Sequence, residues 1–527
     1  MTLRFGAAFL HAVALVVALA MLVPLGWLVL RAVEAPDVAL DVLRSPDTLE
    51  VLWNSLSLAL GVGVLCVLLA LPLAWLTHAT DLPGRRVFRL LFNLPLAVPS
   101  YVAGFVVVAV FGPMGWLRQW TGWPIPEVYG GFGTTLALLY AFPYALLPLQ
   151  AALARTDPRT WEAARSLGAS PARAFVGVVL PGLRPALAGG FLLVALYVLG
   201  DFGAVSLLRF ESLSFVIYLR YQSLFDRAEA VPLGLLLVVV VLVLLLVRRA
   251  IAGQHRPALL ARSGVRAWPV VPLGPWRWPA FALALLVVAF GVVLPVVTVL
   301  LWLVRGLAQG VMLPAVLGVT LRTLGTGALA ALLVLLVAVT PALLQRHGHP
   351  AVARLTWAAS HMGYALPGIV VALSLVFLGT TLLLPLYQTL PLLLFAYVVR
   401  FLPLGLGALH DGIAAQDPRL LEAARSLGSS PLSAWVRVLL PGLRPAIAAG
   451  LLAVFISTIK ELPATLLLSP IGHSALSTRI WSLTEDAFFT AAAPPILLLL
   501  VLAGLALLLQ PGTRVRPRGH RSVNDRS

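Results

Sequence analysis

Three ionisable side chains interrupt long apolar runs of the sequence, where burial of a charge costs roughly 2.5–3.5 kcal/mol per group. Asp201 stands in the run Tyr-Val-Leu-Gly-Asp-Phe-Gly-Ala, whereas Lys460 and Glu461 are adjacent in Ser-Thr-Ile-Lys-Glu-Leu-Pro-Ala. In one interpretation the carboxylates satisfy backbone groups at helix breaks near Gly203 and Pro463, and the lysine and glutamate partly neutralise each other. In the other, the three side chains line a translocation path, where the two acids face a cation.

The two carboxylates occupy equivalent positions of an internal repeat. Residues 161–190 align without a gap to residues 421–450, with 21 identities in 30 positions and an offset of 260. The same offset relates Asp201 to Glu461. The acids are therefore placed pseudo-symmetrically, and both interpretations of them stay open.

Each copy of the repeat contains a polar segment that predicts two short helices. The pair Asp-Pro at 157–158 suits a helix start and Gly168 suits a helix end, which predicts a helix over 158–167. The pair Ser-Pro at 170–171 starts a second helix, which we expect to end at Leu180, ahead of a Pro-Gly pair. The second copy has the same residues at the equivalent positions, so the sequence predicts two helical hairpins.

The first helix of each hairpin carries Glu-Ala-Ala followed by a glycine. These residues are Glu162, Ala163, Ala164 and Gly168 in the first copy, and Glu422, Ala423, Ala424 and Gly428 in the second. The glutamate and an arginine three residues later share a helix face, and the small alanines allow another protein surface to approach closely. A single copy of the motif could be explained as a hairpin that is exposed to solvent and binds no partner. Two nearly identical copies favour a partner that offers two equivalent docking surfaces.

The elements that must position these residues are apolar. The chain has 527 residues, of which 60% are hydrophobic and 11% are charged, and its mean hydropathy is +0.99. This composition excludes a soluble globular protein and a disordered one. Apolar runs long enough to span a bilayer recur along the chain. Twelve candidate spans lie near residues 6–30, 51–77, 88–111, 133–154, 186–208, 230–247, 278–304, 317–344, 356–379, 389–409, 446–468 and 493–509.

The formal net charge of +17 follows from arginines that cluster between the apolar runs, for example at 85–89, 248–266 and 514–521. Acidic residues gather in alternate loops, as at 34–50. This is the distribution of the positive-inside rule. With an even number of spans it predicts a multi-pass membrane protein, surrounded by lipid, with both termini in the cytoplasm. No basic groove with interleaved aromatic residues accompanies the charge, so we expect no nucleic acid partner.

The Arg-, Pro- and Gly-rich segment 249–277 divides the chain. We interpret it as a cytoplasmic linker between a first transmembrane half at 1–248 and a second at 278–510, which a basic tail at 511–527 follows. Each half holds six candidate spans, so the duplication is parallel rather than inverted.

Several kinds of chemistry are excluded by the residues at hand. A phosphate-binding P-loop needs a lysine within Gly-Lys-Ser/Thr, and the single lysine, Lys460, lies between Ile459 and Glu461. The chain is therefore not its own ATPase. No Ser/His/Asp set or carboxylate pair indicates catalytic residues. The neighbouring His347 and His349 lack cysteine or acidic companions, so we expect no metal site.

The repeated hairpins resemble the EAA loop of ATP-binding-cassette importer permeases, in which Glu-Ala-Ala is followed by glycine and then by Ile-x-Leu-Pro. That last motif stands here, with valine in place of isoleucine, as Val178-Val179-Leu180-Pro181 and Val438-Leu439-Leu440-Pro441. The resemblance implies a type I importer permease with two fused halves, whose two loops each dock onto a cytoplasmic ATPase subunit. It also implies a periplasmic or lipid-anchored substrate-binding protein. ATP is then bound by the partner ATPase, and no cofactor is bound by this chain.

The segments around Asp201 and Lys460 resemble those of ferric-iron importer permeases, which carry similar Asp-Phe-Gly and Lys-Glu-Leu-Pro-Ala-Thr-Leu stretches in fused chains. This resemblance implies transport of ferric iron across the bacterial inner membrane. One alternative is a permease of the same class for another solute, such as thiamine or a small anion. The other is an ion-coupled secondary carrier built from two six-helix halves, which leaves the duplicated hairpin without a purpose.

Overall fold

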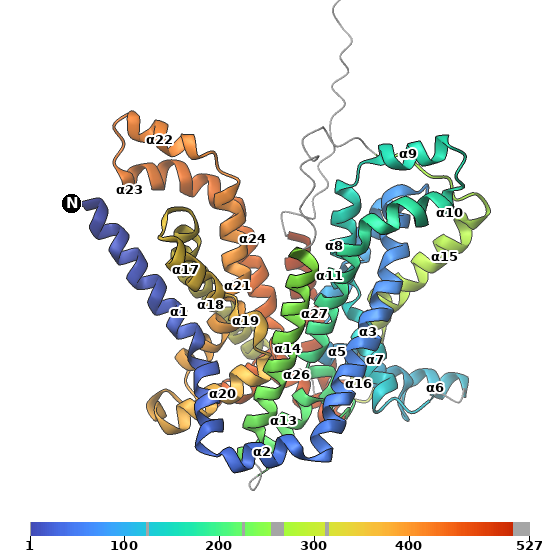
Figure 1. The fold of residues 1–527 in the computed structure, drawn as a ribbon. Helices are drawn as coiled ribbons and strands as arrows, with labels where there is room; N and C mark the ends of the chain where they lie inside the picture. Colours follow the sequence, from blue (N-terminus) through green and yellow to red (C-terminus); the bar gives the residue numbers. More distant parts are fainter. Residues whose placement is uncertain (1, 123–125, 224–226, 254–267, 311–315, 510–527) are drawn as a thin grey trace, which may run out of the picture.

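The chain folds into helices long enough to cross a membrane. The computed structural model describes residues 2–122, 126–223, 227–253, 268–310 and 316–509 (Figure 1). Within these ranges eleven helices are long and apolar enough to span a bilayer, and a bent pair raises the number to as many as twelve. The same ranges hold no strand beyond one isolated bridge. The predicted all-α fold with about twelve spans is confirmed.

The elements of the first half follow one another in this order, with η marking 3-10 and π turns: α1 (Thr2–Glu34), α2 (Pro36–Arg44), α3 (Pro46–Ala79), α4 (Arg85–Leu91), η1 (Leu94–Ala97), α5 (Ser100–Phe111), α6 (Trp116–Thr121), α7 (Gly131–Leu138), η2 (Leu139–Ala141), α8 (Pro143–Arg155), α9 (Pro158–Ser166), α10 (Pro171–Ala174), η3 (Phe175–Val179), α11 (Leu180–Leu199), α12 (Gly203–Leu207), α13 (Leu213–Gln222), η4 (Arg227–Glu229) and α14 (Ala230–Gly253).

The second half continues with η5 (Gly274–Trp276), α15 (Arg277–Val288), η6 (Ala289–Val293), α16 (Leu294–Ala308), α17 (Leu317–His347), α18 (Pro350–Ser360), α19 (Met362–Ala365), α20 (Gly368–Thr381), η7 (Leu384–Leu386), α21 (Leu390–Ala414), α22 (Pro418–Ser426), α23 (Pro431–Ala434), η8 (Trp435–Leu439), α24 (Leu440–Ile459), α25 (Pro463–Leu468), α26 (Leu476–Glu485) and α27 (Phe489–Leu509).

The first helices of the two halves are exchanged. Helix α1 is joined to α3 through α2, yet it packs against α17, α18 and α20 of the second half (Figure 1). There the Ser374 hydroxyl donates a hydrogen bond of 2.6 Å to the Pro24 carbonyl. In the opposite direction, the Tyr140 hydroxyl donates a 2.8 Å hydrogen bond to the carbonyl of Phe290, between α15 and α16. The two halves of the sequence are therefore interlocked in space.

Two of the predicted spans are broken at matching points. The span predicted at 88–111 consists of α4, η1 and α5, and the break ends at Pro99. The span predicted at 356–379 consists of α18, α19 and α20, with a bend of 104° at Pro367. Proline lacks a backbone N–H and restricts the residue before it, so a helix does not continue through these positions unaided. Residues at both breaks line the cavity described below.

The second helix of each hairpin does not end where the sequence predicted. Instead of stopping at Leu180, the chain stays helical from α10 through η3 into α11, which ends at Leu199. A proline inside a regular helix clashes with the carbonyl four residues before it. The π turn over Phe175–Val179 widens the helix just ahead of Pro181 and relieves that clash. The second copy repeats the arrangement with η8 and α24, so each hairpin is continuous with a membrane helix.

Two helices that the sequence analysis did not anticipate extend the repeat. Helix α13 follows the first buried acid and α26 follows the second. The Ser55 hydroxyl accepts a 2.7 Å hydrogen bond from the Leu213 N–H at the start of α13. The Thr323 hydroxyl accepts one of 2.9 Å from the Leu476 N–H at the start of α26. Each half therefore ties this helix to its second long membrane helix in the same way.

The predicted linker is described in part. Helix α14 continues to Gly253, beyond the predicted boundary at 248, and residues 254–267 lie outside the described residues, as does the predicted tail at 511–527. Where the described chain resumes, the indole N–H of Trp268 donates a 3.2 Å hydrogen bond to the Leu153 carbonyl at the end of α8. This end of the linker is therefore attached to the first half. The domain boundaries themselves stay predictions.

Candidate coupling hairpins and cavity

The two hairpins are built as the sequence predicted at their first helices. The Asp157 carboxylate accepts the Arg159 N–H at 3.0 Å at the start of α9, and the Asp417 carboxylate accepts the Arg419 N–H at 2.9 Å at the start of α22. Gly168 and Gly428 follow these helices, both with φ of +84°, a left-handed conformation that favours glycine. The local chemistry of the repeat therefore gives two hairpins of the same shape.

Both hairpins project from the same end of the molecule, well separated from each other (Figure 1). Glu422 is exposed and Glu162 is half-buried. Beside the left-handed glycines, the side chains of Leu167 and Leu427 are 89% and 86% exposed. The sequence analysis missed these leucines, although they stand at matching positions of the repeat. A pair of exposed leucines next to polar helices is a surface suited to contact with another protein.

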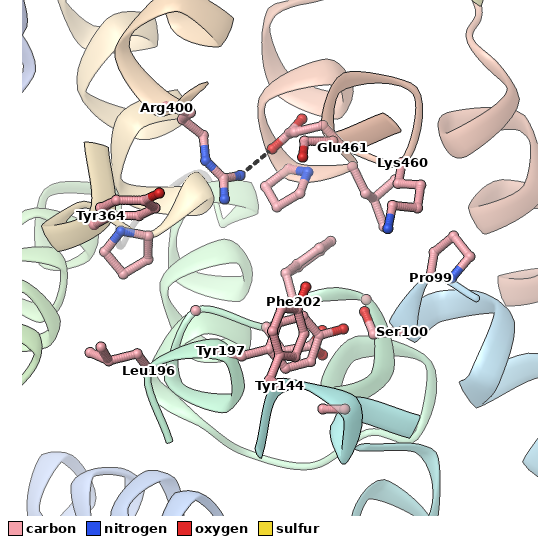
Figure 2. Close-up of a pocket in the computed structure, with 18 of the residues that line it drawn as sticks. Pro99, Ser100, Tyr144, Leu196, Tyr197, Phe202, Tyr364, Arg400, Lys460 and Glu461 are labelled. Atoms are coloured by element: carbon pink, nitrogen blue, oxygen red, sulfur yellow. Dashed lines mark hydrogen bonds and ion pairs between the residues drawn. The ribbon is translucent and has the colours of Figure 1, made fainter. Parts of the chain in front are cut away.

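The three intramembrane residues singled out in the sequence line one cavity. It has a volume of about 540 Å³ and lies between the halves, with walls from η1, α8, α11, α19, α21 and the segments after α11 and α24 (Figure 2). Asp201, Lys460 and Glu461 all belong to its lining. Asp201 and Glu461 are 6% and 5% exposed. Whether these residues contact a cargo stays a prediction.

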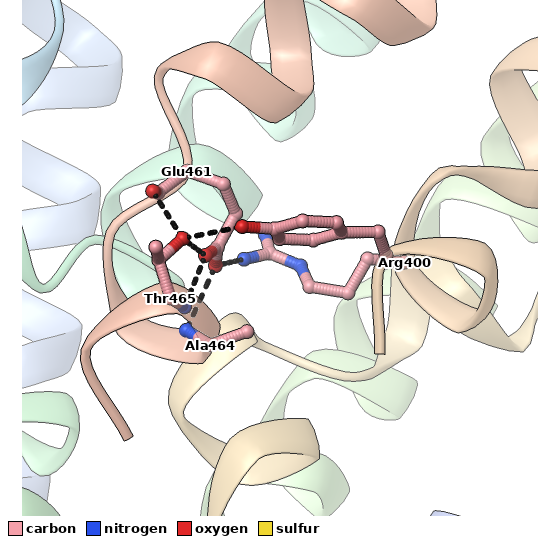
Figure 3. Close-up of polar contacts among 5 residues, drawn as sticks. Arg400, Glu461, Ala464 and Thr465 are labelled. Atoms are coloured by element: carbon pink, nitrogen blue, oxygen red, sulfur yellow. Dashed lines mark hydrogen bonds and ion pairs between the residues drawn. The ribbon is translucent and has the colours of Figure 1, made fainter. Parts of the chain in front are cut away.

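Glu461 is held by donors on both of its carboxylate oxygens (Figure 3). Oε1 accepts a 2.5 Å hydrogen bond from Arg400 and a 3.2 Å bond from the Ala464 N–H. Oε2 accepts the Thr465 N–H at 3.0 Å and lies 3.0 Å from the Thr465 hydroxyl, which also reaches the backbone carbonyl of Glu461. Glu461 therefore caps α25 and forms an ion pair with Arg400.

Asp201 caps the equivalent helix without a cationic partner. Its Oδ1 accepts the Ala204 N–H at the start of α12 at 2.9 Å, and the Ser100 hydroxyl is its side-chain hydrogen-bond partner. The Ser214 hydroxyl donates to the Asp201 backbone carbonyl at 2.5 Å. Both carboxylates thus satisfy backbone groups that a helix break has freed, one with neutral donors and one with an arginine.

The expected neutralisation of Lys460 by Glu461 is wrong. The Lys460 ammonium instead donates a 2.8 Å hydrogen bond to the Leu96 carbonyl in η1 of the first half. Adjacent residues at the break diverge, because Glu461 turns back onto the N-terminus of α25 whereas Lys460 extends across the interface between the halves. Arg400, the true partner of Glu461, was missed, although it is an ionisable residue within the predicted span 389–409.

Gly368 makes room for this ion pair. A Cβ atom at Gly368 would lie 1.9 Å from Arg400 Nη1 and 3.0 Å from Glu461 Oε1. We expect Gly368→Ala to displace the guanidinium and to lower the melting temperature of the purified protein, because the displacement weakens a buried ion pair whose complete loss costs about 3–5 kcal/mol. Gly407→Ala is the control, since a Cβ there meets nothing within 4 Å. Equal melting temperatures for the two variants would contradict this account of the glycine.

Side chains that commonly bind metal ions do not gather in the described part of the chain. No group of three or more His, Cys, Asp or Glu side chains is placed there to hold a metal ion. The cavity does present oxygen atoms of another kind, from Ser100, Tyr144 and Tyr197 as well as Asp201. The rings of Tyr144 and Tyr197 pack together with centroids 5.1 Å apart. These residues make a polar wall of hydroxyl groups around one carboxylate.

A helical membrane fold in two repeated halves, with paired hairpins at one end and a polar cavity between the halves, defines a transport permease. The family model of the binding-protein-dependent transport system inner membrane component matches the chain twice, at residues 71–259 and 336–515. The chain belongs to this family. It is a multi-pass inner-membrane permease of the ATP-binding-cassette type with two fused halves, and such permeases operate with a substrate-binding protein and an ATPase rather than as enzymes.

The chain is similar to permeases for different cargoes. It is 28% identical to the Fe(3+)-transport system permease protein FbpB 2 of Haemophilus influenzae over 515 residues, 94% of this chain and 96% of the relative. It is 26% identical to the ferric transport system permease protein FbpB of Actinobacillus pleuropneumoniae over 488 residues, 87% of this chain and 70% of the relative. The sulfate transport system permease protein CysT of Escherichia coli is 30% identical over 217 residues, 40% of this chain and 78% of the relative.

Proposed function

We propose that this chain is the permease through which an ATP-driven importer moves ferric iron, delivered by a substrate-binding protein, across the bacterial inner membrane. The observation that carries this proposal is the extent of the match to the Fe(3+) permease, which covers 94% of this chain. Both halves contribute walls to the cavity. A relative that spans both halves is therefore a better guide to cargo than one that spans 40% of the chain.

ATP hydrolysis belongs in this proposal to two cytoplasmic ATPase subunits, one docked at each hairpin. The equivalence of α9 with α22, and of exposed Leu167 with exposed Leu427, supports two equivalent docking sites. The hairpins then lie in the cytoplasm, and so does the N-terminal end of α1, which lies toward the same end of the molecule (Figure 1). The arginine-rich tail supports a cytoplasmic C-terminus as well. This chain binds no cofactor, and ATP binds the partner.

The helices that continue from the hairpins supply a route for coupling. Helix α11 ends at Leu199 and α24 ends at Ile459, each two residues before a buried acid that lines the cavity. A force applied at a hairpin by closure of the ATPase dimer moves a stiff helix rather than a flexible loop. Displacement at the docking site is therefore delivered to the cavity wall.

The proposal is tested with the permease reconstituted in proteoliposomes with its ATPase and binding protein. We expect uptake of ⁵⁵Fe(III) that requires ATP hydrolysis and stops when the ATPase is inactivated by mutation. Iron uptake that persists with an inactive ATPase would support the ion-coupled carrier instead. Uptake of labelled thiamine without uptake of iron would assign the same machine to another cargo.

A small anion is the second candidate cargo, because basic residues outnumber acidic ones in the cavity. Arg248, Arg400 and Lys460 line it together with only two carboxylates, Asp201 and Glu461. The similarity to a sulfate permease over part of the chain points the same way. Uptake of [³⁵S]sulfate in the absence of iron would favour this candidate.

A further inference from the structure

The two walls of the cavity differ in charge although the repeat relates them. Lys460 stands where the first half has Gly200, and Arg400 stands where it has Tyr140, at the common offset of 260. Figure 2 shows Arg400, Lys460 and Glu461 on one side of the cavity and Ser100, Tyr144 and Tyr197 across from them. We call the first group the basic wall. The second group, together with Asp201, is the hydroxyl wall.

The basic wall keeps hydrogen-bond donors to spare. The Lys460 ammonium carries three N–H donors, and its hydrogen bond to the Leu96 carbonyl uses one. Arg400 donates to Glu461 through Nη1, while its Nε is buried with no hydrogen-bond partner among the described residues. Unmet donors in a buried site are unfavourable unless a ligand accepts from them.

The same wall has no free acceptor for a cation. Both oxygens of Glu461 are engaged by Arg400, Ala464 and Thr465. No carboxylate lies within ion-pair distance of Lys460 in the described part of the chain, and so its positive charge is uncompensated. A bare trivalent cation that met Asp201 on the hydroxyl wall would be repelled by the lysine opposite.

We propose that the basic wall is an oxyanion-binding subsite and that the metal crosses the membrane together with an oxyanion ligand, either a carboxylate or phosphate. The oxyanion accepts hydrogen bonds from Lys460 and Arg400, while the hydroxyl wall faces the metal. Arginine and lysine bind carboxylate and phosphate oxygens in just this way. The negative charge of the oxyanion offsets the positive charge of the metal, and this reduces the repulsion between the metal and Lys460. The inference rests on the proposed function, because it specifies the chemical form in which iron enters the cavity.

Dual-label uptake in proteoliposomes tests the proposal. The complete importer is supplied with ⁵⁵Fe(III) loaded on its binding protein together with [¹⁴C]citrate in one arm and [³²P]phosphate in the other. We expect labelled oxyanion to enter with iron in a fixed ratio in at least one arm, and the arm identifies the oxyanion. Iron uptake without either label would overturn the inference and leave the proposed function standing. Uptake of an oxyanion without iron would retain the subsite and refute the iron proposal.

Variants of Lys460 test the subsite itself. Lys460→Gln removes the charge and is expected to lower the uptake of iron and of oxyanion about tenfold or more, because a hydrogen bond to a charged group is lost. Lys460→Arg keeps charge and donors and should retain uptake of both. Arg86→Gln, which removes an exposed charge from α4 outside the cavity, is the control. Membrane abundance is measured for each variant. Normal dual uptake by Lys460→Gln would overturn the inference.

Discussion

Glu461→Ala is expected to lower the melting temperature and the membrane abundance of the permease more than other single substitutions in the cavity. The change leaves Arg400 in the protein interior with no carboxylate, and it removes the acceptors of the Ala464 and Thr465 N–H groups. Removing one partner of a buried ion pair costs about 3–5 kcal/mol. The measurement is thermal unfolding of the detergent-purified protein, with quantitative immunoblotting of membranes.

Asp201→Asn is the matched comparison at the equivalent position of the repeat. Asp201 has neutral donors, and asparagine keeps an oxygen that accepts the Ala204 N–H, so we expect a loss of about 1 kcal/mol. If Asp201 contacts the cargo, iron uptake falls although folded protein remains. Reduced abundance in place of reduced uptake would assign Asp201 a structural role alone.

A second-site variant shows whether the ion pair explains the loss at Glu461. Replacing Arg400 by methionine in the Glu461→Ala background removes the unpaired charge, and stability is expected to recover in part. A double variant as unstable as Glu461→Ala would mean that the lost helix cap, and not the orphaned arginine, accounts for the damage. A stable Glu461→Ala single variant would contradict the burial argument altogether.

Local sequence signals predicted the repeat and its first helices well. Asp157 and Asp417 each cap the start of a helix ahead of a proline, and a glycine follows the end of each helix. The preferences of these residues for helix ends act over only a few residues of the chain. Long apolar runs predicted the membrane spans for a similar reason, because the lipid bilayer demands long continuous apolar segments. Each of these features depends on neighbours in the chain and on little else.

Features that depend on distant residues escaped the sequence analysis. The exchange of α1 between halves rests on contacts such as Ser374 to Pro24, which no local pattern encodes. The pairing of Arg400 with Glu461 depends on the space left by Gly368 on a third segment. The helix continues through Pro181 because a π turn precedes it. A π turn has no clear sequence signature, whereas a proline is a familiar signal for the end of a helix.

Glu162→Ala combined with Glu422→Ala is expected to weaken binding of the ATPase and to reduce substrate-stimulated ATP hydrolysis by about tenfold or more, if each glutamate forms a charge-assisted hydrogen bond with the ATPase. Both residues lie on the projecting hairpins (Figure 1), and neither lines the cavity. The melting temperature of the permease is measured alongside as an internal check on folding. Co-purification of the ATPase and stimulated hydrolysis in proteoliposomes are the measurements.

The serines on the same helices provide the matched control for this double variant. The Ser166 hydroxyl donates to the Glu162 carbonyl at 2.9 Å, and the Ser426 hydroxyl donates to the Glu422 carbonyl at 3.0 Å, so both are bonded within their own helix. Ser166→Ala with Ser426→Ala should keep most of the stimulated activity.

Leu167→Ala with Leu427→Ala, which removes the exposed apolar tips, should lose ATPase binding as the glutamate variant does. Unchanged assembly and stimulation in both the glutamate and the leucine variants would refute docking through these hairpin residues.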